Sequence, residues 1–261
     1  MAGYIGNKAV NLSTSGADIS GTANLDIIDV DGAANFAADV TFADGADIIT
    51  ASAGTSNFRA GVNAGNSIAS GGNYNVVVGD EAGTALTTGD NNTAVGFEAL
   101  STEDGHGNNV AIGYRALKTL NAGAAGYNTA VGVDAGLSVT TGIYNNLFGY
   151  IAGDALTSGG LNTAIGSFSL TADTLGSRSV AVGHGTLANQ NFTSSTNAYN
   201  TVVGYAAGNA VTTGTNNTLI GGLAGDATTT GGSNVALGYQ ALTSNTTASE
   251  NTAVGYQAAY S

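Results

Sequence analysis

The feature that most constrains the fold of this chain is a nine-residue motif that returns at a nearly fixed interval. The sequence Asn-Thr-Ala-Val-Gly-Phe-Glu-Ala-Leu at 92–100 returns as Asn-Thr-Ala-Val-Gly-Tyr-Gln-Ala-Ala at 251–259. Twelve copies share a glycine that has Asn, once Ser, four places before it and a small residue three places after it. Eight of the eleven intervals between these glycines are 17 residues, and the others are 18, 19 and 21. A short fixed period is typical of stacked units that bury a core only against their neighbours.

Two columns of the repeat are occupied almost without exception. The glycines are Gly61, Gly79, Gly96, Gly113, Gly132, Gly149, Gly166, Gly183, Gly204, Gly221, Gly238 and Gly255. The asparagines four places earlier are Asn57, Asn75, Asn92, Asn109, Asn128, Asn145, Asn162, Asn200, Asn217, Asn234 and Asn251, with Ser179 as the exception. We expect the glycines to form a corner, because only glycine enters positive φ freely. We expect the asparagines to form a ladder in which each side-chain amide bonds the coils above and below.

Composition agrees with short strands joined by tight turns. The chain of 261 residues contains 41 Gly and no Pro, and only 9% of its residues are charged. Stacked apolar, small and Asn columns therefore predict an all-β chain, a parallel β-solenoid or β-roll of about twelve 17-residue coils. Twelve coils at the usual strand spacing would extend roughly 55–60 Å.

The two residues before each glycine are both apolar in nearly every copy, for example Ala94-Val95 and Leu147-Phe148. Successive strand residues face opposite sides, so one column must face the solenoid interior and the other must face outward. A long outward apolar stripe is typical of a surface that packs against other chains, which predicts a homo-oligomer, most simply a trimer. The alternative is that both columns lie inside a wide coil.

A longer repetition divides the array into three blocks of four coils, at 57–123, 124–195 and 196–261. The residue four places after the glycine is Gly, Gly, Leu, Leu in each block, with Ala in the last place of the third. The intervals of 19 and 21 fall at the joins between blocks, which indicates duplication of a four-coil unit.

Residues 1–56 lie outside the repeat and hold seven of the eighteen acids. Leu25–Val30, Phe36–Phe42 and Ala46–Ala51 are predicted strands, and Asp-Gly turn signals separate them. We interpret this segment as an acidic attachment or oligomerisation module, with a frayed leader as the alternative. It has no basic and then apolar start, so a secretion signal is not expected, and no run of about 18 apolar residues predicts a membrane span.

Charge and motifs argue against several classes of function. The net charge of −13 disfavours nucleic acid as a partner. No phosphate-binding loop is present, and neither His106 nor His184 has a second His or Cys at ligand spacing, so we expect no catalytic residues, no cofactor and no metal.

Two weaker interpretations concern the turns. Acids such as Asp90 and Asp226 offer ligands for calcium, but the spacing of calcium-binding nonapeptide repeats is missing. Threonine pairs such as Thr87-Thr88 suggest an ice-binding face; they are interrupted in several copies, and we interpret them as strand residues.

Aromatic residues are the stronger indication of a binding surface. The position directly after the glycine holds Phe97, Tyr114, Tyr150, Tyr205, Tyr239 and Tyr256. Such rings along one edge suit stacking on a cell-surface glycan. The alternative is that they cover the corner or pad a contact between chains.

The unit Asn-Thr-Ala-Val-Gly-Tyr-x-Ala-Leu and its Ser-Val-Ala-Val-Gly form at 179–183 resemble the head repeats of trimeric autotransporter adhesins, which are trimeric left-handed β-rolls with a shorter period. The longer period and the opening Met-Ala-Gly-Tyr-Ile-Gly-Asn-Lys resemble fibre proteins of marine tailed phages, especially cyanophages. That resemblance implies a non-enzymatic tail or appendage fibre on the virion, docked on other virion proteins through residues 1–56 and active in adhesion and host recognition. The alternatives are a bacterial surface adhesin or extracellular filament subunit, and a polysaccharide depolymerase with acids in a groove between chains.

Overall fold

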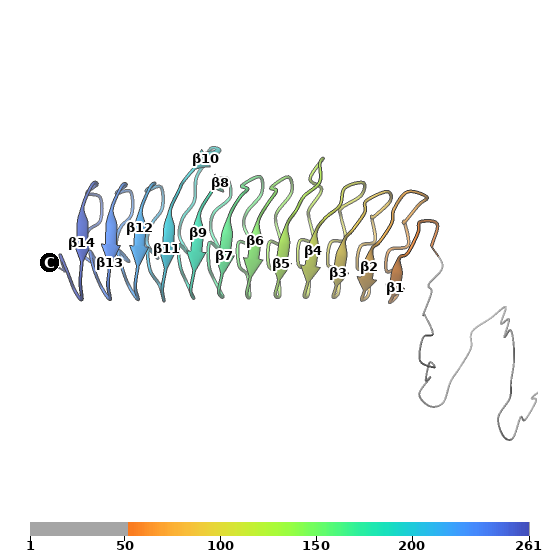
Figure 1. Ribbon diagram of the computed structural model, residues 1–261, viewed down its shortest axis with the longest axis horizontal. Coiled ribbons are helices and arrows are strands. Elements are labelled where there is room, and N and C mark those ends of the chain that lie inside the picture. Colours follow the sequence, from red (N-terminus) through yellow and green to blue (C-terminus); the bar gives the residue numbers. More distant parts are fainter. Residues whose placement is uncertain (1–51, 261) are drawn as a thin grey trace, which may run out of the picture. The chain divides into compact units, whose positions relative to one another are not determined.

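The computed structural model describes residues 52–260 and confirms a parallel β-solenoid of about twelve turns. Each coil, numbered 1 to 12 by its corner glycine, adds one three-residue strand to a single sheet, and the strands lie side by side in a row (Figure 1). These strands are β1 (Phe58–Ala60), β2 (Val76–Val78), β3 (Thr93–Val95), β4 (Val110–Ile112), β5 (Thr129–Val131), β6 (Asn146–Phe148), β7 (Thr163–Ile165), β9 (Val180–Val182), β11 (Thr201–Val203), β12 (Thr218–Ile220), β13 (Val235–Leu237) and β14 (Thr252–Val254). The strands expected in residues 1–56 lie outside the described residues.

A second, two-stranded sheet occurs where the repeat is longest. β8 (Gly176–Ser177) and β10 (Thr196–Asn197) pair in parallel; β8 precedes Gly183, and β10 lies inside the 21-residue interval from Gly183 to Gly204. The extra residues of that interval therefore remain hydrogen-bonded to the preceding coil.

Every pair of neighbouring strands in the main sheet is parallel and in register, so identical columns lie above one another. Ala94 pairs with Ala111, for example, and Val95 with Ile112. Hydrogen bonds between coils continue beyond the strands, as from Glu98 N to Asp80 O at 3.0 Å. Bonding around the whole turn is what a chain with so few large side chains needs to satisfy its buried backbone.

The strands end at the corner glycines, whose φ lies between 124° and 141°. Conformation is not the only constraint. A Cβ on Gly166 would lie 2.5 Å from the carbonyl oxygen of Gly183 in the next coil, so a side chain would collide with backbone. The column requires glycine both for its dihedral angle and for the close stacking of coils.

The core lies inside the coils and is built from the middle residue of each strand and from turn residues. Middle residues such as Ala94, Leu147 and Leu219 are fully buried, whereas the first and third residues of each strand face outward. The two apolar columns therefore face opposite sides, and the alternative of a wide coil enclosing both is wrong. The reason is the pleat: three residues of one strand alternate in direction.

The Gly, Gly, Leu, Leu order has a packing explanation. In coil 6 the strand supplies Leu147 and the turn supplies Gly153, where a Cβ would lie 2.8 Å from Leu147 Cδ2. In coil 7 the strand supplies Ala164 and the turn supplies the buried Leu170. The core of coil 6 is thus filled by a leucine on the strand, and the core of coil 7 by a leucine in the turn. The turn leucines are Leu100, Leu117, Leu170, Leu187 and Leu242, with φ between 49° and 60°.

Candidate binding surface

The outer face of the main sheet consists of the first and third residues of each strand: the third-position row is apolar in every coil, and the first-position row is mostly threonine and valine. Its third-position row contains large side chains that are at least a third exposed: Ile112, Phe148, Ile165, Ile220, Leu237 and Val254. From β2 to β14 no residue of this face carries a charge.

The predicted aromatic residues form a row beside this face, because the corner glycine turns the chain immediately before each of them. We call this the aromatic row: the residues directly after the corner glycines, from Phe97 to Tyr256. The six predicted rings are all exposed. Neighbouring rings stack on each other, with centroids 5.5 Å apart for Phe97 and Tyr114 and 5.6 Å apart for Tyr239 and Tyr256. In each of these two pairs, one face of each ring is therefore covered by its neighbour.

A second row of tyrosines was not predicted from the sequence. Tyr74, Tyr127, Tyr144 and Tyr199 stand directly before the ladder asparagines and are exposed. Tyr127 and Tyr144 stack with centroids 5.0 Å apart. The residue at this position has a positive φ in every coil. Because it is never glycine, its residue type gave no sign of a turn, and only its fixed place before the asparagine could have indicated one.

Charged side chains beside the aromatic row pair with one another between coils. Arg115 binds Asp134 through two bonds of 2.8 Å, and Lys118 Nζ lies 2.7 Å from a carboxylate oxygen of Glu98. The hydrogen bond that Arg115 donates to the Asp134 carboxylate raises the pKa of Arg115. These pairs neutralise each other at the surface and contribute little to stability.

The asparagine ladder connects each coil to the next through the backbone. Asn145 Nδ2 donates to Gly159 O at 3.0 Å, and Asn145 Oδ1 accepts from Asn162 N at 3.1 Å. Asn162 repeats the arrangement with Gly176 O and Ser179 N, each at 2.9 Å. Amide–amide bonds, which we expected throughout, join only a few pairs such as Asn251 and Asn234 at 2.9 Å. The amide instead pairs a backbone C=O and a backbone N–H of the next coil, which would be costly to leave buried without a partner.

At Ser179, which replaces asparagine in the ladder, Gln190 supplies the side-chain amide. Gln190 Nε2 donates to Ser179 Oγ at 3.0 Å, and Gln190 Oε1 accepts from Asn200 Nδ2 at 2.8 Å. Gln190 Nε2 also donates to the fully buried Asp173 at 2.6 Å, and burial raises the pKa of that carboxyl group. This network was missed because its members come from two different columns of the repeat, four residues before and seven residues after the corner glycine.

The threonine pairs lie in bends and not in strands, so that interpretation is wrong. Thr229 Oγ1 donates to Thr246 O in the next coil at 2.9 Å, and Thr157 Oγ1 donates to Thr174 O at 3.0 Å. These hydroxyl groups donate hydrogen bonds that join neighbouring coils. Turn acids also act as acceptors between coils, as Asp90 does for Asn73 N at 2.6 Å.

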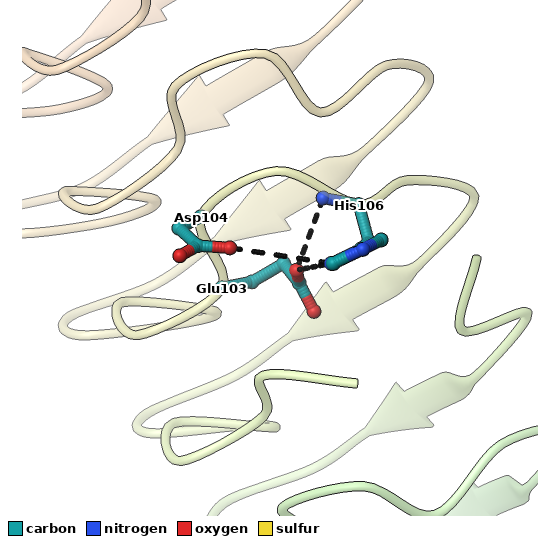
Figure 2. A group of neighbouring side chains, drawn as sticks. All are labelled: Glu103, Asp104 and His106. Atoms are coloured by element: carbon teal, nitrogen blue, oxygen red, sulfur yellow. Dashed lines mark hydrogen bonds and ion pairs between the residues drawn. The ribbon is translucent and has the colours of Figure 1, made fainter. Parts of the chain in front are cut away.

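The two histidines have different surroundings. His184 belongs to the aromatic row and stacks on Tyr205 at 5.6 Å. His106 lies beside Glu103 and Asp104, and one ligand atom from each falls within 4.8 Å of the others (Figure 2). The buried Glu103 already accepts from His106 N at 3.2 Å and from Ala122 N at 3.3 Å. Two carboxylates and an imidazole can hold a divalent cation, but these bonds explain the burial of Glu103 without one.

Residues 52–260 contain no helix long and apolar enough to cross a membrane. No known protein family, curated protein or solved structure matches this chain.

Proposed function

We propose that this chain is a non-enzymatic fibre protein whose solenoid packs with other copies into a rigid rod for attachment to a host or another surface. The observation that carries the proposal is the exposed apolar third-position row on an outer face that carries no charge from β2 to β14. A soluble chain with a net charge of −13 has little reason to expose such a row to water unless another chain covers it.

The dimensions of the outer face support this packing. Twelve strands at the usual spacing are about 58 Å long, and three residues span about 10 Å, giving roughly 600 Å² per copy. Stable interfaces bury about 800 Å² per partner, so the rows of rings that flank the face must also take part in each contact. In a trimer each copy would share its face with two neighbours, and stacked columns would repeat each contact from coil to coil.

The virion is the assembly we propose for this rod, with residues 1–56 docking it on other virion proteins. The support is the resemblance of the repeat and of the opening residues to fibre proteins of marine tailed phages. The runner-up is a bacterial surface adhesin or filament subunit, supported by the resemblance of Ser179–Gly183 to adhesin head repeats. Antibodies against the chain should label phage particles in the first case and the cell envelope in the second.

Light scattering on the purified chain tests the packing. We expect three times the chain mass of 25.4 kDa. Ile165→Glu and Ile220→Glu place charges on the outer face and should yield folded monomers, because a buried unpaired carboxylate is costly. Thr213→Glu, on an exposed bend outside the sheet, is the matched control and should leave the mass unchanged. A wild-type monomer at all concentrations would exclude the packing.

A further inference from the structure

Three positions of the aromatic row lack a ring, Val133, Ser167 and Gly222, and of these only Gly222 has no side chain. In its C-terminal half the row reads His184, Tyr205, Gly222, Tyr239 and Tyr256. His184 stacks on Tyr205 at 5.6 Å and Tyr239 stacks on Tyr256 at 5.6 Å, with interplanar angles of 17° in both pairs. Gly222 lies between the two pairs and adds no side chain.

The corresponding position in coil 7 shows how the row is otherwise filled. Ser167 is also small, but Phe168 contacts both flanking rings, with centroids 5.4 Å from Tyr150 and 5.4 Å from His184. In coil 10 the residue after Gly222 is Leu223, which has no ring. Coil 10 therefore places no ring between Tyr205 and Tyr239, whereas in coil 7 the ring of Phe168 contacts both Tyr150 and His184.

The walls of this gap are supported from behind. One face of Tyr205 is covered by His184 and one face of Tyr239 by Tyr256, so the remaining faces are directed toward Gly222. Tyr205 is 63% exposed and Tyr239 46% exposed, so the opening is accessible. Stacked neighbours hold both walls in place before a ligand arrives, which lowers the cost of binding.

The spacing indicates the thickness of the occupant. Coils two apart are separated by about 9.6 Å, twice the usual strand spacing. A flat ring contacting both tyrosines at the best carbon–carbon separation would need them only about 7–8 Å apart. A puckered ring with hydrogens on both sides is thicker and fills the gap better.

We propose that the slot formed by Tyr205, Gly222 and Tyr239 binds a neutral pyranose ring. Aromatic faces are electron-rich and attract the C–H groups of a sugar face, and the tyrosine hydroxyl groups are suited to its hydroxyls. The chain's charge of −13 disfavours sugar acids. The inference rests on the proposed attachment function and gives it a ligand class. A slot with two walls is shallow, so we expect dissociation constants of about 1 mM or weaker.

Saturation-transfer NMR with methyl β-glucopyranoside, methyl β-galactopyranoside and glucuronate, each at concentrations up to about 20 mM, tests the slot in the full chain. Transfer to at least one neutral glycoside should be strong, and transfer to glucuronate should be weaker. Gly222→Tyr should reduce the signal at least tenfold by filling the gap. Gly222 has no positive φ, and a Cβ there would lie 3.4 Å from Tyr239 Cδ2, which is ordinary contact, so this variant should fold.

Val133→Tyr is the matched control, because it adds the same ring to the same row away from the slot. It should leave the sugar signal unchanged. Absence of transfer in the wild type, undiminished transfer in Gly222→Tyr, or equal binding of glucuronate would overturn the proposal. Light scattering on the same samples separates the two proposals: an oligomer that binds no sugar refutes only the slot, and a monomer that binds sugar refutes only the packing.

Discussion

Coil 6 carries its core leucine on the strand, at Leu147, and a glycine in the turn, at Gly153. Leu147→Ala should cost about 2–5 kcal/mol, because the side chain is fully buried and its removal leaves a cavity. Gly153→Leu should cost about 1–3 kcal/mol, because its Cβ alone would lie 2.8 Å from Leu147 Cδ2 and 2.9 Å from Leu156 Cδ1.

The double variant should lose less stability than the sum of the two single effects. With both changes, coil 6 acquires the arrangement of coil 4, where Ala111 is on the strand and Leu117 and Leu120 are in the turn, all fully buried. Independent effects would sum to about 3–8 kcal/mol. We expect the double variant to lie within about 2 kcal/mol of the parent, the remainder being the strain of a leucine at positive φ. The coupling between the two sites should therefore reach about 1 kcal/mol or more.

Amide hydrogen exchange measures this effect locally, which matters because solenoids need not unfold in one step. The Gly149 amide, bonded to Val131 O at 2.8 Å, reports on coil 6, and the Gly238 amide, bonded to Ile220 O at 2.8 Å, serves as a distant control. Protection at Gly149 should fall in each single variant and return in the double. A double variant that loses the sum of the two single effects would refute the exchange of leucine between strand and turn.

Three further outcomes follow from the columns. Gly166→Ala should lower the melting temperature far more than Gly255→Ala. Both residues have a positive φ, but only a Cβ on Gly166 would collide with the backbone of the next coil. Equal losses would show that the dihedral angle alone matters. Asn145→Ala should cost about 2–5 kcal/mol in chemical unfolding by leaving a buried N–H and a buried C=O unpaired, and a loss below about 0.5 kcal/mol would contradict this. Burial raises the folded pKa of Asp173 above its unfolded value of 3.8, so its contribution to stability is present below pH 3.8 and is lost as pH rises through the folded pKa. Melting temperatures across that range should show this decline in the wild type but not in Asp173→Asn, and identical profiles would count against it.

Much of the surface could be anticipated from particular residues, and some could not. The position after the corner glycine predicted exposed rings at Tyr114 and Tyr205, and both are exposed. Their mutual stacking depends on ring orientation between coils, which a column of letters does not specify. Phe168 illustrates the same limit, since it fills a gap in the row from the next column along.

The period of the sequence by itself determined the all-β solenoid, its number of coils and the place of each strand, because a 17-residue repeat with stacked glycine and asparagine columns has few other ways to satisfy its backbone. It also favoured one apolar column inside and one outside, and the structure excluded the alternative of both columns inside a wide coil. Only the tertiary structure decided which column lies inside, how Leu147 and Leu170 fill one core from different positions, and how Gln190 completes the ladder beside Ser179. These are contacts between neighbouring coils, and they depend on side-chain direction at turns with positive φ, which periodicity does not encode.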